Sequence, residues 1–276
     1  MHILVATDMS ARSDRAVRRG VDLALRHKAD VSVLSIVDDA GPEALTAQMV
    51  TSTKAELGRF VASLPGSDAH EVIVIAGDPT ATLVDRVRSL RPDLLVLGRH
   101  RERSFLDGMF EATAGRLVRL TSCPVLMVAD RADHSYDRVL AATDFSPAAA
   151  AAIALADALS PGARIDPVHA FHVPYDGVLS RVGGGTTDIE DSFYAEAAAA
   201  DATWRARHAL PATCGATRIL PGSPLEILST QARETGATLI AAGAHGRVGQ
   251  GRPLLGSVVT DLMRLAPCDL LIARPG

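Results

Sequence analysis

Residues 243–258 have the sequence GAHGRVGQGRPLLGSV, and the fold of the chain can be worked out from this stretch. The apolar run Thr238 to Ala242 precedes it and predicts a buried strand, and the amphipathic segment Ser257 to Leu265 predicts a helix. The intervening glycines and serine follow the spacing G-x2-G-x9-G-S. Glycine lets the backbone approach a ligand closely, and the first amides of a helix lack intrahelical partners and lie at the positive end of its dipole. A strand, a glycine-rich loop and a helix N-terminus in this order predict a phosphate site.

Length, charge and cysteine content narrow the class of protein. With 276 residues, 47% of them hydrophobic, the chain is long enough for two domains of about 100 to 150 residues. The net charge is −4 and neither half is basic, which argues against nucleic-acid binding. The first residues, MHILVATD, contain no basic region, and no stretch approaches the roughly 20 apolar residues of a membrane span. The three cysteines form no C-x2-C pair. We therefore expect a cytoplasmic protein with reduced thiols and no membrane partner.

The first half of the chain alternates strand-like apolar runs with segments of helical period. Five strands separated by four helices indicate a parallel sheet covered by helices on both faces, which is a Rossmann-like α/β fold. The expected strands are His2 to Thr7, Val31 to Val37, Glu71 to Ala76, Leu94 to Gly98 and Val125 to Ala129.

The second half repeats this plan, which predicts two domains of the same fold, residues 1–130 and 137–276. An ATD sequence occurs at 6–8 and again at 142–144, and the helix start GDP at 77–79 is matched by GSP at 222–224. The spacing between the halves grows by eleven residues between the second and third strands of the second repeat. This insertion contains Gly183 to Gly185 and predicts a mobile loop.

These features together resemble the universal stress protein family in its tandem, two-domain form. The resemblance rests on the early-strand Asp, the G-D/S-P helix start, the G-x2-G-x9-G-S loop and a last strand that follows Cys-Pro or Cys-Asp. It implies a five-stranded adenine-nucleotide-binding fold of the adenine-nucleotide alpha-hydrolase type. It also implies dimerisation through the last strand, giving intramolecular domain pairing or a homodimer, and a role in stress resistance or signalling.

The resemblance also assigns an ATP site to the second repeat. It implies that Asp144 and the backbone of Ala170 contact adenine and that Gly243 approaches the ribose. The phosphates would meet backbone amides and one hydroxyl, from Gly246, Gly256, Ser257 and Val258. His245 and Arg247 lie beside this loop in sequence and could offset phosphate charge. Mg²⁺ would accompany the triphosphate, although no residue stands out as its ligand.

The corresponding loop of the first repeat has lost these residues. Alignment of Gly98 with Gly243 places Arg101, Glu111 and Ala112 where the second repeat has Gly246, Gly256 and Ser257. A larger side chain would fill phosphate space, and a carboxylate near the helix start would compete for its amides. We therefore expect ATP in the second domain only. Asp8 is retained, which leaves a pocket for adenine alone open, and the arginine-rich residues 99–103 could meet another anion, a partner or solvent.

Simpler interpretations stay open beside these. The loop at 243–257 could connect a strand to a helix without a ligand, and Asp144 could merely shape a turn. His169 and His172 have a metal-like spacing but would point to opposite faces of a strand, so we expect no zinc site. Trp204, the only tryptophan, is expected to be a packing residue.

No catalytic residue is predicted. The glycine-rich loop lacks a Walker-type G-K-[ST], and no nucleophile has an adjacent base. Bound nucleotide would then serve as a structural or signalling ligand, although slow hydrolysis of ATP assisted by His245 is left open. The alternative function is a pseudo-dimeric interaction protein that works without nucleotide.

Overall fold

The computed structural model describes residues 1–11, 13–66, 70–99, 108–121, 123–129, 134–172, 187–244 and 255–274, and of 108–113 and 187–189 only the backbone. The residues group into two compact units. Unit 1 comprises Met1–Ser135 with Met263–Leu265 and Asp269–Ile272, and unit 2 comprises Tyr136–Leu262 with Ala266–Cys268 and Ala273–Gly276.

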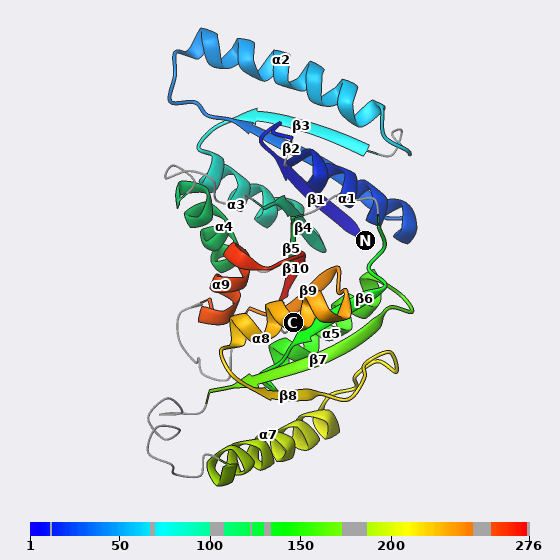
Figure 1. Ribbon diagram of the computed structural model, residues 1–276. Helices are drawn as coiled ribbons and strands as arrows, with labels where there is room; N and C mark the ends of the chain where they lie inside the picture. Colours follow the sequence, from blue (N-terminus) through cyan, green and yellow to red (C-terminus); the bar gives the residue numbers. More distant parts are fainter. Residues whose placement is uncertain are drawn as a thin grey trace. The chain divides into compact units, whose positions relative to one another are not determined.

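Unit 1 is built on a parallel sheet with the strand order β3-β2-β1-β4-β5, and β10 pairs antiparallel with β5 (Figure 1). The first four crossovers contain α1, α2, α3 and α4. The elements are β1 (His2–Thr7), α1 (Ser13–His27), β2 (Asp30–Val37), α2 (Glu43–Ala62), β3 (His70–Ala76), α3 (Pro79–Leu90), β4 (Leu94–Gly98), α4 (Gly108–Leu120), β5 (Val125–Val128) and β10 (Asp269–Ala273).

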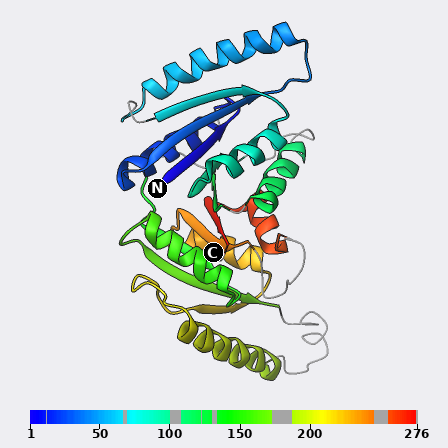
Figure 2. The ribbon, with the colours of Figure 1, turned by 180° about the vertical axis from the view of Figure 1, so that it is seen from behind.

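Unit 2 repeats the order of the first four strands of unit 1. Its parallel strands lie in the order β9-β6-β7-β8, and Figures 1 and 2, which view the chain from opposite sides, show α8 and α5 on opposite faces of this sheet. The described elements are β6 (Arg138–Ala142), α5 (Pro147–Leu159), β7 (Arg164–Phe171), α7 (Thr187–Arg207), β8 (Arg218–Pro221), α8 (Pro224–Thr235), β9 (Leu239–Gly243) and α9 (Ser257–Leu265).

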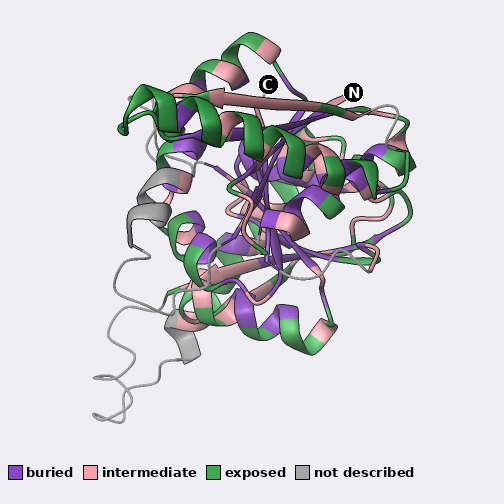
Figure 3. Ribbon diagram, turned by 90° about the horizontal axis from the view of Figure 1, so that it is seen from above, coloured by how far each residue is buried: buried purple, intermediate pink, exposed green. Residues whose placement is uncertain are grey.

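The central strands of each unit are apolar along their whole length. β4 and β9 each have four successive buried residues, as expected for parallel strands with helices on both faces. Figure 3 shows this burial in the strands, while the outer sides of the helices are exposed. The predicted α/β fold with two repeated domains is therefore confirmed, with strand bounds that differ from the expected ones by one residue in several places.

The turn after the first strand demonstrates the duplication at atomic detail. In unit 1, Thr7 Oγ1 accepts a hydrogen bond from Met9 N at 3.0 Å, and Met9 has a left-handed φ of 61°. In unit 2, Thr143 Oγ1 accepts from Phe145 N at 3.0 Å, and Phe145 has φ 63°. A positive φ is unusual for residues other than glycine, so its recurrence at equivalent positions supports one ancestral turn used twice.

Two further expectations can be compared with the structure. No helix among the described residues is long and apolar enough to cross a membrane. The expected mobile loop around Gly183–Gly185 lies outside the described residues.

Candidate nucleotide site

The turn between β6 and α5 presents the first candidate side chain. Asp144 Oδ1 accepts a hydrogen bond from Ser146 N at 3.1 Å, which closes a turn directly after the strand. Ser146 then caps α5, because its side chain accepts from Ala149 N at 3.2 Å, and Pro147 opens the helix. The Asp144 carboxyl group is therefore held at the carboxyl end of the sheet, where open parallel sheets bind ligands.

The end of β7 supplies backbone beside this turn. The ladder between β6 and β7 ends at the pair Ala142 and Val168, and Thr143 N donates to Val168 O at 3.0 Å. Alternate residues of a strand direct their main-chain groups to the same neighbour. Ala170 therefore directs its N–H and C=O past the end of the β6 ladder, where a ligand could use them.

The sequence pointed to His169 only through its metal-like spacing with His172, whereas the structure places its ring beside the Asp144 turn, between Val168 and Ala170 in the chain. Its Nδ1 lies 2.8 Å from Thr143 O, and because a carbonyl only accepts, Nδ1 carries the proton. Its ring centroid lies 4.4 Å from that of Phe145, with a tilted geometry. The histidine was predicted to hold no metal, and among the described residues no group of three or more His, Cys, Asp or Glu could hold an ion.

Gly243, at the end of β9, is required by packing. A Cβ at this position would lie 2.7 Å from the carbonyl carbon and the Cβ of Ala148 and 2.8 Å from Ala149 N. Such contacts would force the backbone of α5 away from β9. The glycine therefore allows the first turn of α5 to lie against the strand, a requirement of close helix–strand packing that exists without a ligand.

Gly256, at the start of α9, differs from Gly243 in this respect. Its φ of −61° suits any residue, and among the described atoms a Cβ would meet only Ala244 O, at 3.9 Å. Neither backbone strain nor described packing explains a glycine here. Gly256 N donates to Ala244 O at 3.1 Å, and no side chain caps the helix. The amides that follow, from Ser257 to Val259, lie in the first turn of α9, where helices bind anions.

These pieces line one pocket in unit 2. The pocket has a volume of about 210 Å³ and is bordered by the ends of β6, β7 and β9 and the starts of α8 and α9. Six of the nine predicted site residues are among its lining: Asp144, Ala170, Gly243, Gly256, Ser257 and Val258. The other three, His245, Gly246 and Arg247, lie outside the described residues. The lining also contains His169 and the apolar side chains of Val168, Leu228 and Val259.

The equivalent turn of unit 1 differs at its aspartate. Asp8 Oδ1 accepts from Ser10 N at 3.0 Å and also from the Ser13 hydroxyl at 2.5 Å. Ser13 N donates to Ser10 Oγ in unit 1, and Ala149 N donates to Ser146 Oγ in unit 2. Ala149 therefore occupies the position of Ser13, and it has no hydroxyl. The carboxylate of Asp8 is thus used inside its own turn.

The remaining first-repeat candidates are only partly described. Arg99 is 4% exposed, so it is buried and not a solvated loop residue. His100, Arg101 and Arg103 lie outside the described residues. The helix α4 begins at Gly108, and Glu111 is therefore the fourth residue of the helix.

The three cysteines form no disulfide. Cys268 is buried, and Cys123 and Cys214 are half-buried. Burial raises the pKa of the Cys214 thiol, and Asp201 and Asp157 add to this, while Arg205 opposes it. Cys214 is accordingly a protonated, weakly nucleophilic thiol at neutral pH.

Comparison with known proteins identifies the family. A sequence model described as the universal stress protein family matches residues 1–129 and again residues 135–274. The chain belongs to the universal stress protein family. Its two matches follow one another along the chain, which makes it a tandem member.

Some known universal stress proteins are similar to this chain over nearly its whole length. A universal stress protein of Mycolicibacterium smegmatis is 29% identical over 292 residues, covering 99% of this chain and 97% of its own length. The structure of a universal stress protein from Archaeoglobus fulgidus matches with a TM-score of 0.68 at 18% identity, covering 100% of this chain and 98% of that chain. It therefore shares the fold. A universal stress protein solved in complex with cAMP matches 46% of this chain and 96% of its own, with a TM-score of 0.38 at 20% identity.

Proposed function

We propose that this universal stress protein binds ATP in unit 2 alone, and that the nucleotide acts as a structural or signalling ligand in a stress response. The proposal assigns the intact loop to a domain of residues 137–276 and the altered loop to a domain of residues 1–130. Asp144 and the backbone of Ala170 would meet the adenine, and Gly243 would lie beside the ribose.

The observation that carries the proposal is Gly256. It lacks a side chain at a position where neither backbone conformation nor described packing requires glycine, and it begins a helix without a side-chain cap. Gly256 and Asp144 line the same pocket although they are far apart in the sequence. An anionic group at the first turn of α9 and a base at Asp144 would explain both features with one ligand.

The electrostatics of the pocket favour an anion held by backbone amides. Asp144 is the one Asp or Glu among the described lining residues, and these include no Lys or Arg. Charge on the phosphates would therefore be met by Ser257, Val258 and the helix dipole, with His245 and Arg247 as further candidates. Since no described cluster of carboxylates and histidines suits a metal, we assign no protein ligand to Mg²⁺, which would be held by the phosphates themselves.

Titration calorimetry of wild type and of Gly246→Arg with ATP tests the proposal. This substitution gives the second repeat the arginine that the first repeat has at the matching position. We expect wild type to bind one ATP for each chain and the variant to lose binding. The matched control is Arg101→Ala in the first repeat, which should leave ATP affinity unchanged. Unchanged affinity in Gly246→Arg, or purified protein that neither carries nor binds adenine nucleotide, would refute the assignment in favour of a nucleotide-independent interaction protein.

A further inference from the structure

A cluster of three rings in unit 2 packs behind the turn that carries Asp144. Trp204, on α7, is 3% exposed and donates from Nε1 to Ser146 O at 3.0 Å. Its ring meets the Phe145 ring edge-on at a centroid distance of 6.0 Å. Phe145 also packs on the His169 ring, at a centroid distance of 4.4 Å. The left-handed residue Phe145 is therefore in contact with two rings, and the backbone of Ser146 is hydrogen-bonded by a buried indole.

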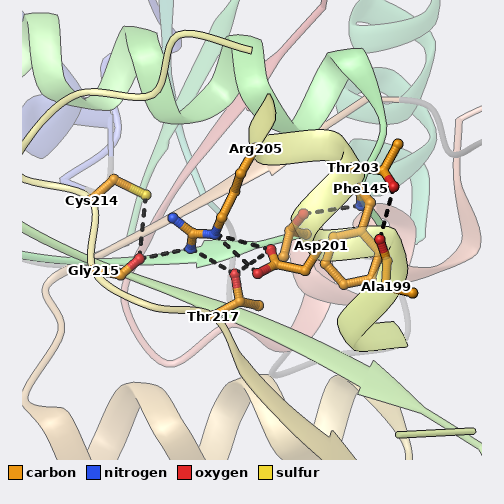
Figure 4. A network of polar contacts seen from close by, with 9 residues as sticks. Phe145, Ala199, Asp201, Thr203, Arg205, Cys214, Gly215 and Thr217 are labelled. Atoms are coloured by element: carbon orange, nitrogen blue, oxygen red, sulfur yellow. Dashed lines mark hydrogen bonds and ion pairs between the residues drawn. The ribbon is translucent and has the colours of Figure 1, made fainter. Parts of the chain in front are cut away.

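The helix that carries Trp204 is tied to the sheet by a polar network (Figure 4). Arg205 Nη2 donates to Gly215 O at 2.7 Å and to Thr217 Oγ1 at 2.8 Å, and its Nε lies 3.0 Å from Asp201 Oδ2. Gly215 N in turn donates to Ile165 O of β7 at 2.9 Å. β7 also carries His169, whose ring packs on Phe145 of the turn. These contacts therefore link the turn, α7 and β7 to one another. The position of Trp204 is thereby fixed relative to the pocket wall.

Unit 1 has the same Thr and Asp hydrogen bonds in this turn but different side chains around it. Its left-handed residue is Met9, and Ser35 occupies the position of His169, as the matching bonds of Gly77 to Val37 and of Gly222 to Phe171 align the strands. There the Ser13 hydroxyl bonds the Asp8 carboxylate and holds the turn against α1. The turn of unit 1 thus has a second hydrogen bond to its carboxylate, from Ser13, in addition to the one from Ser10 N.

We propose that Trp204 is a positioning residue for the nucleotide site of unit 2: with Phe145 and His169 it holds the Asp144 turn in its binding shape. This inference rests on the proposed function. A strained left-handed residue persists only where its surroundings determine it. Around Phe145 these are the hydrogen bond from its N–H to Thr143 Oγ1, the two neighbouring rings, and the bond from Trp204 to Ser146 O. The helix α7 therefore controls the part of the pocket that meets the base, separately from the phosphate cradle at α9.

Two variants separate this role from general stability. Trp204→Phe keeps a packed ring but removes the N–H donor to Ser146. Ala149→Ser places the hydroxyl of unit 1 beside Asp144 and should add a second hydrogen bond to the carboxylate, as Ser13 does for Asp8. The matched control is Thr203→Val on the same helix, where the hydroxyl donates to Ala199 O within α7, at 2.9 Å. Circular dichroism and thermal unfolding show whether each variant is folded.

The experiment is calorimetric titration of wild type and these variants with adenosine and with ATP. Since only the ordered turn binds the base, we expect Trp204→Phe to weaken both ligands by the same factor, roughly fivefold for the loss of one hydrogen bond. Ala149→Ser should also weaken both, and Thr203→Val neither. A change of less than twofold in Trp204→Phe, or a loss confined to ATP, would overturn the inference while leaving nucleotide binding intact. Wild type that binds neither adenosine nor ATP would instead overturn the proposed function, and this inference with it.

Discussion

Alanine substitutions at two glycines of the pocket should have opposite consequences. In Gly243→Ala the new methyl would lie 2.7 Å from two atoms of Ala148 and 2.8 Å from Ala149 N. Two of these three contacts are with backbone, so α5 must move away from β9. Overpacking of this kind costs about 1–3 kcal/mol, which for a unit of this size lowers the melting temperature by roughly 3–10 °C.

Gly256→Ala should leave folding almost unchanged. Its φ of −61° is compatible with alanine, and the one described neighbour within 4 Å of the new methyl is Ala244 O at 3.9 Å. We expect a change in stability below about 0.5 kcal/mol. The methyl would, however, keep a phosphate from the amides of α9, and loss of a hydrogen bond to a charged group weakens binding by about tenfold or more.

Thermal unfolding by circular dichroism and titration with ATP, both on both variants, measure the two effects. The prediction is a lower melting temperature for Gly243→Ala and weaker ATP binding at normal stability for Gly256→Ala. If Gly256→Ala unfolds as early as Gly243→Ala, its glycine is structural and the reasoning about the start of α9 is wrong. The same conclusion follows if Gly256→Ala binds ATP with the affinity of wild type.

Three further predictions follow from the contacts of single residues. Asp144→Asn should weaken the binding of adenosine and of ATP alike in calorimetry. Asp8→Asn should change neither affinity, because the Asp8 carboxylate is already bonded by Ser13. Equal losses of affinity in the two variants would show that unit 1 also binds the base. Ser257→Ala should weaken ATP by several-fold and leave adenosine unchanged, and an equal loss for adenosine would place the hydroxyl away from the phosphates. Burial raises the pKa of the Cys214 thiol above its ordinary value of 9.0, which lowers the thiolate fraction at every pH. The rate of iodoacetamide labelling at Cys214, measured by mass spectrometry, should therefore reach half its maximum only above pH 9.0. A midpoint below that pH would contradict the buried environment.

Much of the fold follows from the sequence because its signals are local. Apolar runs such as Leu94–Gly98 have no polar face, which restricts them to strands buried on both sides. Helix starts are equally local: Pro79 and Pro224 each open a helix, and Asp78 accepts from Ala81 N at 2.7 Å as an N-cap. Because the chain is duplicated, an element predicted in one half also supports the equivalent element in the other half.

Part of the candidate site depended on information that no single stretch contains. Trp204 and Phe145 are far apart in sequence, and only the packing of α7 over the Asp144 turn brings their rings together. The two glycines of the loop look equivalent in sequence, yet Gly243 packs against Ala148 and Gly256 does not pack against any comparable backbone among the described residues. The sequence indicated His169 only as a possible metal ligand. Its place in the pocket could not be predicted, because its contact with Thr143 O depends on where the β6 ladder ends. Its position one residue before Ala170 was the one indication that it lies near the site.

The central claim, one nucleotide site in a duplicated chain, is tested most directly by the number of ATP molecules bound per chain. Native mass spectrometry of the intact protein with increasing ATP counts them without an assumption about activity. The account predicts a single bound ATP for each chain, which is lost in Gly246→Arg and retained in Asp8→Asn. Two bound ATP molecules for each chain, or one that persists in Gly246→Arg, would contradict it.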